Sequence, residues 1–237
     1  MSTRRAWAAL EAEIVACRRC PRLVAWREEV ARVKRRAYRD WTYWGRPVPG
    51  FGDPAARVLL VGLAPAAHGA NRTGRMFTGD SSGDWLFAAL HAVGLADRPR
   101  AESCDDGLSL RRAFLTASCR CAPPDNRPAP GELAACAPFL DAEIDLLREV
   151  RVVVALGRIA WNAVLARARR ADPGRIPRPR PAFGHGAEAG VALHAGAPEI
   201  LLLGSYHPSR QNTQTRRLTR AMLDAVLARA AERAGAP

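Results

Sequence analysis

The chain has 237 residues, with 36 Lys or Arg against 23 Asp or Glu, which gives a formal net charge of +13. A hydrophobic fraction of 48% excludes wholesale disorder and suits a single α/β domain over residues 1–237. No apolar run approaches the roughly 20 residues that a membrane-spanning helix needs. The excess of basic residues favours a polyanionic partner, with nucleic acid as the first candidate.

The N-terminal segment, residues 5–37, has apolar residues at helical spacing and is interrupted near Cys20 and Pro21, because proline cannot continue a helix interior. It lacks the apolar centre and small-residue cleavage site of a signal peptide, so we expect a cytoplasmic protein. The aromatic stretch that follows, residues 41–54, is rich in Gly and Pro and is interpreted as a loop.

Four short apolar runs follow at wide spacing, and each is nearly continuous rather than alternating. They lie at 57–63, 113–117, 151–157 and 199–207. Continuous hydrophobicity indicates strands that are buried on both faces, as in a parallel sheet. Helical patterns lie between the runs and after the last one, so the sequence predicts a three-layer α/β/α fold around a central four-stranded parallel sheet. Residues 169–191, rich in Arg, Pro and Gly without a period, are interpreted as a long connection that either is solvated or contacts a nucleic-acid backbone.

Ligands of parallel sheets bind beyond the carboxyl ends of the strands, so the loops that leave those ends are the candidate active site. The loop after the first run, residues 62–80, contains Gly62, His68, Phe77 and Asp80. It matches neither a phosphate-binding loop nor a dinucleotide fingerprint, which disfavours nucleotide cofactors. Phe77 is either a core residue or an aromatic platform for an extruded base.

The loop after the last run begins with His207, which directly follows a buried strand and is therefore a candidate catalytic residue. Hydroxyl, amide and guanidinium donors follow it at Ser209, Arg210, Gln211 and Asn212. Together with a helix N-terminus, these donors suit contacts to DNA phosphates.

The cysteines form a second group. Cys17 and Cys20 are a C-x₂-C pair at the helix break, and Cys121 and Cys136 flank a proline-rich loop. Four thiolates in a reducing compartment could hold zinc or an iron–sulfur cluster, and the spacing alone does not choose between them; unliganded buried thiols are the alternative. Cys119 lies two residues before Cys121 and is the residue most easily confused with it as a ligand.

With these motifs in view, the sequence resembles the uracil-DNA glycosylase superfamily, and specifically its family 5, the type-b enzymes of bacteria and archaea. Residues 62–80 are similar to the first family motif and the stretch from His207 to Thr219 is similar to the second. The resemblance runs from Cys17 to the last helix and implies a 4Fe–4S cluster on Cys17, Cys20, Cys121 and Cys136.

Two departures from neighbouring families are informative. Most of the superfamily has a carboxylate or Asn in the first motif, where this chain has Leu63 and Ala64, and related enzymes have a uracil-reading Asn where this chain has residues 115–118 without an amide. Both absences are typical of the type-b branch, which removes uracil and also the deaminated purines hypoxanthine and xanthine. Asn126 and Asp80 remain as polar candidates for base recognition and water positioning.

Our hypothesis for the mechanism is that His207 donates to the departing base, Asp80 holds the attacking water, and Phe77 stacks the flipped base with main-chain N–H groups near Gly62 and His68 reading its edge. Strand-cutting glycosylases need an amine nucleophile, and the sole lysine, Lys34, lies outside the motifs. We therefore expect a monofunctional repair enzyme that acts on double-stranded DNA and leaves an abasic site.

We also expect this enzyme to be a monomer associated with the nucleoid. The alternative is a non-catalytic protein, stapled by iron–sulfur or zinc, that only binds nucleic acid. This alternative explains the charge and the cysteines, but it does not explain why polar loops converge on one edge of the sheet.

Overall fold

The computed structural model describes residues 3–175 and 178–235. In chain order its elements are α1 (Thr3–Ala16), α2 (Pro21–Val33), η1 (Arg36–Tyr38), β1 (Phe51–Gly52), β2 (Val58–Gly62), α3 (Ala70–Thr73), α4 (Ser81–Ala92), β3 (Ala113–Ala117), η2 (Pro124–Asn126), α5 (Pro130–Leu146), β4 (Val152–Leu156), α6 (Arg158–Ala171), η3 (Pro173–Arg175), β5 (Glu188–Val191), β6 (Ile200–Ser205), α7 (Arg210–Gln214) and α8 (Arg220–Ala234).

Within the described residues, the sheet has six strands in the order β1-β3-β2-β4-β6-β5. Its centre is the predicted set of four parallel strands, with Leu60 of β2 opposite Leu115 of β3 on one side and opposite Val154 of β4 on the other. The two edge strands, β1 and β5, are short and antiparallel. The predicted fold class is confirmed, and the expected strand count was too low by these two edges.

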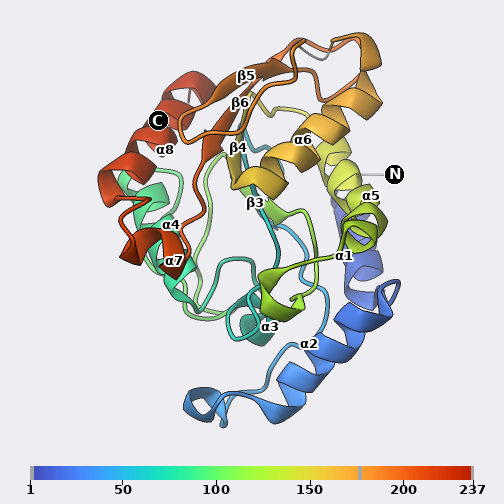
Figure 1. The fold of residues 1–237 in the computed structure, drawn as a ribbon, viewed down its shortest axis with the longest axis vertical. Helices are drawn as coiled ribbons and strands as arrows, with labels where there is room; N and C mark the ends of the chain where they lie inside the picture. The colour runs from blue at the N-terminus through green and yellow to red at the C-terminus, as the bar shows by residue number, and fades with distance from the viewer. Residues whose placement is uncertain (1–2, 176–177, 236–237) are drawn as a thin grey trace.

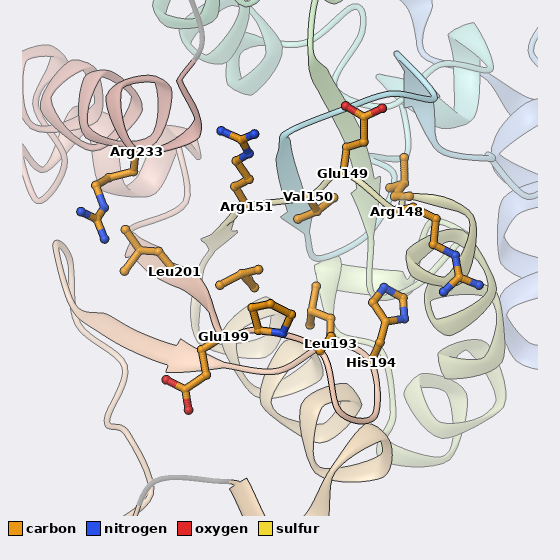
Figure 2. A pocket seen from close by; sticks show the side chains of 13 residues that line it. Arg148, Glu149, Val150, Arg151, Leu193, His194, Glu199, Leu201 and Arg233 are labelled. Atoms are coloured by element: carbon orange, nitrogen blue, oxygen red, sulfur yellow. The ribbon is translucent and has the colours of Figure 1, made fainter.

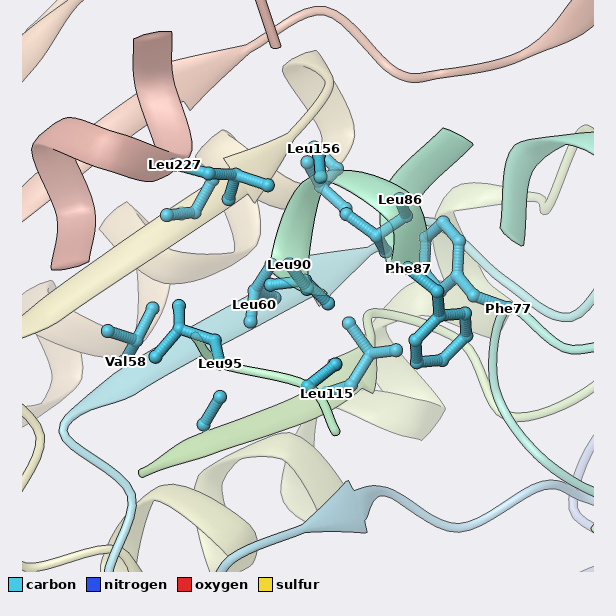
Figure 3. Close-up of a cluster of buried hydrophobic side chains, with 14 of the residues drawn as sticks. Val58, Leu60, Phe77, Leu86, Phe87, Leu90, Leu95, Leu115, Leu156 and Leu227 are labelled. Carbon is cyan, nitrogen blue, oxygen red and sulfur yellow. The ribbon is translucent and has the colours of Figure 1, made fainter. Parts of the chain in front are cut away.

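Helices cover both faces of the sheet, which makes three layers (Figure 1). Because side chains alternate along a strand, Val58 and Leu60 of β2 point to the layer of α4 and α8, while Leu59 and Val61 point to the layer of α1, α5 and α6. Figure 3 shows the first of these cores, where leucines of α4 and α8 meet the sheet. Burial on both faces explains why the strand sequences are continuously apolar.

The predicted break at Cys20 is observed, because α1 ends at Ala16 and α2 begins with Pro21 at its first position, where a proline leaves no backbone donor unsatisfied. The prediction for residues 169–191 was partly wrong. Helix α6 continues to Ala171, and β5 occupies residues 188–191, where it pairs with β6. Residues 176–177 of that connection lie outside the described residues. Among the described residues, no helix is both long and apolar enough to cross a lipid bilayer.

Candidate active site

A cleft of about 830 Å³ opens at the carboxyl ends of the parallel strands. Its lining comes from the loop after β2, the loop after β3, the loop after β6 and the turn that follows α2. The cleft contains most of the predicted site residues, namely His68, Phe77, Asp80, Asn126, His207, Ser209, Arg210 and Gln211. The loop after β4 does not line it, although Gly157 lies against the back of His207.

His207 follows β6 and its ring stacks on that of Phe77, with centroids 5.6 Å apart and planes inclined by 26°. Its main-chain carbonyl accepts a hydrogen bond of 2.8 Å from the Asn212 side chain, which fixes the turn. Burial lowers the pKa of His207 to about 4, so the imidazole is neutral near pH 7. A neutral imidazole in a cleft can donate one N–H to an oxygen without bringing a positive charge.

Phe77 adopts a left-handed backbone conformation, with φ of 54°. The ring lies directly over Gly62, where any side chain would collide with it. Figure 3 places Phe77 beside the core leucines, and the ring is only 8% exposed. Phe77 therefore belongs to the core at one edge and lines the cleft at the other; its core role is confirmed, and its role as a platform for a base stays a prediction.

Asp80 begins α4. Its Oδ1 accepts hydrogen bonds from the main-chain N–H groups of Ser82 (2.9 Å) and Gly83 (3.0 Å). Its other oxygen, Oδ2, lies so close to Gly69 that a Cβ there would overlap with it. Burial raises the pKa of Asp80, while the two N–H donors act in the opposite direction. A carboxylate of this kind has one oxygen fixed and one available to accept a proton from a water molecule.

The remaining predicted residues divide into two groups. His68 borders the cleft, and its Nδ1 lies 3.1 Å from the Tyr43 hydroxyl; burial, followed by the charges of Arg35 and Arg72, lowers its pKa. Asn126 borders the cleft on the loop after β3. Gly62 and Asn212 do not line the cleft: the former makes room for Phe77 and the latter holds the main chain of His207.

The proposed DNA contacts lie at the start of α7. Ser209 is its N-cap, with Oγ accepting from the main-chain N–H of Asn212 at 3.4 Å. Arg210 is exposed and donates to the Ser81 hydroxyl at 3.2 Å, which joins α7 to the start of α4. Gln211 lines the cleft.

Sequence reasoning did not identify Arg35 and Tyr38, which also line the cleft. They follow the end of α2, where Lys34 has φ of 59° and turns the chain back toward the loop after β2. Tyr38 and Trp41 enclose the buried guanidinium of Arg72, at 4.0 and 4.1 Å from the two ring centroids. Arg72 also donates to the carbonyls of His68 and Gly79, both at 2.8 Å. The aromatic residues within 38–44 were the feature of the sequence from which a contribution of this segment to the site could have been predicted.

The four predicted cysteine ligands line one small cavity between α1, α2, the loop after β3 and α5, and Cys119 lines it too. Two nitrogen donors reach the sulfurs: Arg27 Nη1 lies 2.9 Å from Cys121 Sγ and the main-chain N of Arg120 lies 3.2 Å from Cys136 Sγ. A hydrogen bond from Cys119, together with Arg120, lowers the pKa of Cys136 to about 7, whereas burial raises that of Cys121 to about 11. Within the described ranges, no three His, Cys, Asp or Glu side chains converge on a point where a single metal ion could sit.

A second cavity, of about 520 Å³, lies at the amino ends of β4 and β6 (Figure 2). Arginines 148, 151 and 233 border it, together with His194 and Glu199. No predicted site residue borders this cavity. The loops that carry the predicted site residues leave the carboxyl ends of the strands, whereas this cavity lies at the amino ends. The first cleft is therefore the candidate active site.

The sequence of this chain is similar to that of known proteins over most of its length. Residues 49–231 match the family model described as the uracil DNA glycosylase superfamily. Similar curated proteins include the type-5 uracil-DNA glycosylase of Thermus thermophilus, 55% identical over 94% of this chain and 95% of that protein. That of Mycobacterium tuberculosis is 54% identical over 95% of this chain and 81% of that protein. A type-4 enzyme from Sulfurisphaera tokodaii is more distant, at 28% identity over 67% of this chain and 57% of its own length.

Proposed function

The chain belongs to the uracil-DNA glycosylase superfamily and, within it, to the type-5 enzymes, and on that premise we propose that it hydrolyses the N-glycosidic bond of uracil in DNA during repair. The observation that carries the proposal is the cleft itself, in which a neutral His207, a half-buried Asp80 and the ring of Phe77 meet. A binding module has no need for such a group of partly buried titratable side chains at the carboxyl ends of its strands.

The reaction separates charge: the sugar becomes cationic as the base leaves with the bonding electrons. His207 lowers the barrier by donating an N–H to the base oxygen on which negative charge accumulates. Because its pKa is about 4, His207 donates as a neutral imidazole and keeps its own proton at neutral pH. Asp80, with Oδ2 free of the helix cap, orients water toward the anomeric carbon and accepts its proton.

The substrate range extends in our proposal to hypoxanthine and xanthine in duplex DNA. Leu63 and Ala64 line the cleft without offering a hydrogen bond to the base. The polar side chains at the end of β3 are already engaged: Thr116 donates to Glu143 and Ser118 donates to the carbonyl of Gly62. Few side-chain groups are left there to reject a base by its pattern of donors and acceptors, which supports loose discrimination. Main-chain groups and Asn126 supply the remaining polarity.

The cleavage is monofunctional in our proposal. Lys34, the sole lysine, donates to the carbonyl of Arg39 at 3.1 Å and does not line the cleft. A Schiff base with the sugar would require an amine at the anomeric carbon. We therefore expect borohydride to trap no covalent adduct between the protein and DNA.

We propose that Cys17, Cys20, Cys121 and Cys136 hold a 4Fe–4S cluster. The fit is supported by the cavity that these four residues share and by the two nitrogen donors directed at its sulfurs. Among the described residues, no three potential ligands are placed to hold a single metal ion, and this favours a cluster, whose iron atoms bind the four thiolates separately, over one zinc ion. Bound there, the cluster would join α1 and α2 to the loop after β3 and to α5, and would add metal–thiolate bonds to the folding free energy.

The experiment is single-turnover excision on duplex oligonucleotides that contain uracil, hypoxanthine or xanthine, with alkali treatment to reveal abasic sites. The proposal requires strand breaks only after alkali, and on more than one base. His207→Ala should slow excision at least tenfold while leaving DNA affinity intact. Tight DNA binding without excision of any base would instead support the non-catalytic nucleic-acid-binding protein.

A further inference from the structure

Arg27 on α2 is the most buried cation of the N-terminal region, with 2% of its side chain exposed. Its Nη1 donates to Cys121 Sγ at 2.9 Å and its Nη2 donates to the main-chain carbonyl of Cys17 at 3.2 Å. Its Nε has no hydrogen-bond partner among the described residues. The guanidinium is thus directed at two of the proposed cluster ligands, from inside the protein.

A buried cation is costly unless an anion lies beside it. Arg120, equally buried, satisfies this rule with Glu143 at 2.7 Å. Arg27 does not: its nearest carboxylate is Glu28 at 3.9 Å, which is 44% exposed and already bound to Arg18 at 2.5 Å. The cysteine cavity is the remaining place for a compensating negative charge, and a 4Fe–4S core bound by four thiolates is an anion.

The main chain of Arg27 contacts the loop after β2, which carries His68 and Asp80. Its carbonyl accepts a hydrogen bond of 3.2 Å from Nδ2 of Asn71, which is fully buried. The same Nδ2 lies 3.4 Å from the carbonyl of Ala67, a residue that lines the cleft. Both neighbours are carbonyl oxygens, so the amide must present its NH₂ group to them. Asn71 is a polar residue of the first motif that does not line the cleft, so the proposed reaction gives it no part.

We propose that Arg27 and Asn71 form a positioning pair, in which Arg27 neutralises the cluster and Asn71 transmits the resulting placement of α2 to the loop that carries His68 and Asp80. The inference rests on the cluster assigned under the proposed function. Removing the guanidinium leaves the cluster charge uncompensated, which shortens the life of the cluster and makes its reduction harder. Removing the amide leaves the cluster intact and frees only the loop.

The test compares Arg27→Gln, Arg27→Lys and Asn71→Ala with the wild-type protein, all purified with iron bound. Arg32→Gln is the matched control, because Arg32 is on the same helix, is 72% exposed and pairs with the exposed Glu29. Three readouts are followed: the decay of visible absorbance under air and chelator, the reduction potential by voltammetry, and hydrogen exchange of amides in residues 66–74.

We expect Arg27→Gln to lose its cluster at least threefold faster, to shift the reduction potential to more negative values and to speed exchange in the loop. Arg27→Lys keeps the charge, so its reduction potential should stay close to the wild-type value. It is the variant to measure if Arg27→Gln does not fold. Asn71→Ala should speed loop exchange at least threefold with the wild-type cluster lifetime, and Arg32→Gln should change nothing.

Wild-type lifetime, potential and exchange in Arg27→Gln would overturn the inference and leave the cluster proposal standing, as would a clear negative shift of the reduction potential in Arg27→Lys, where the charge is kept. So would a loss of the cluster in Asn71→Ala as fast as in Arg27→Gln, since the amide would then act on the cluster directly. A wild-type protein that contains no iron would overturn both proposals.

Discussion

One carboxylate oxygen of Asp80 caps α4, and the other is the proposed acceptor of a proton from water. These two roles can be separated by substitution. Asparagine is as good an N-cap as aspartate, and its side-chain oxygen can accept from the same N–H groups of Ser82 and Gly83. Asp80→Asn should therefore change the free energy of unfolding by less than about 0.5 kcal/mol. It cannot accept a proton from water, so the excision rate should fall by about 10²–10⁴-fold.

Asp80→Ala removes both roles. It should show the same loss of rate and, in addition, a loss of about 1 kcal/mol of stability, which is a fall of about 2–4 °C in Tm for a chain of this size. Thr219→Ala is the matched control, because the Thr219 hydroxyl caps α8 by accepting from the N–H of Met222 at 3.3 Å. It should lower Tm by a similar amount without slowing excision.

The assay is single-turnover uracil excision as a function of pH, paired with thermal unfolding. Burial raises the pKa of Asp80, so the wild-type rate should fall as the pH drops through that raised value and the carboxylate takes up a proton. Asp80→Asn should lose this acid limb. If Asp80→Asn excises uracil within threefold of the wild-type rate, Asp80 is a helix cap only and the water-activation argument is refuted.

Other substitutions test the cleft and the core. Phe77→Ala should remove base stacking of about 1–3 kcal/mol, slowing excision about 5- to 150-fold in the single-turnover assay with unchanged affinity for undamaged DNA. Gly69→Ala places a methyl group against Oδ2 of Asp80 and should slow excision at least tenfold while the circular-dichroism spectrum stays native. Glu143→Gln breaks a fully buried ion pair and should cost about 3–5 kcal/mol in denaturant unfolding, whereas Asp141→Asn, at an exposed pair on the same helix, should cost less than about 1 kcal/mol. Equal effects of the last two would contradict the burial argument.

The centre of the fold could be predicted because strands buried on both faces leave a continuous apolar signature, as in residues 152–156. The edge strands could not. β1 has two residues, and β5 contains Glu188 and Gly190, so their pairing depends on the neighbouring strand rather than on their own sequence. Asp80 as a helix cap was predictable in principle, because an aspartate before Ser-Ser-Gly is a helix start signal.

The candidate site was predictable as a set of loops but not as a set of contacts. The strand-end rule brought His207 and the loop of residues 62–80 to the same edge, where the structure places them. It could not tell that Gly62 and Asn212 support other site residues from behind, because this depends on how Phe77 and His207 are turned. It also missed Tyr38, which reaches the cleft only through the turn at Lys34.

The contacts of Arg72 have a thermodynamic consequence. Its guanidinium lies between two aromatic rings and donates to the carbonyls of His68 and Gly79, so it links the two ends of the loop formed by residues 68–79. The conformational entropy of that loop is therefore lost when the chain folds, not when a damaged base arrives. A pre-organised loop lets more of the interaction energy with DNA be used to extract the base from the helix, and its polar groups need little rearrangement as charge develops.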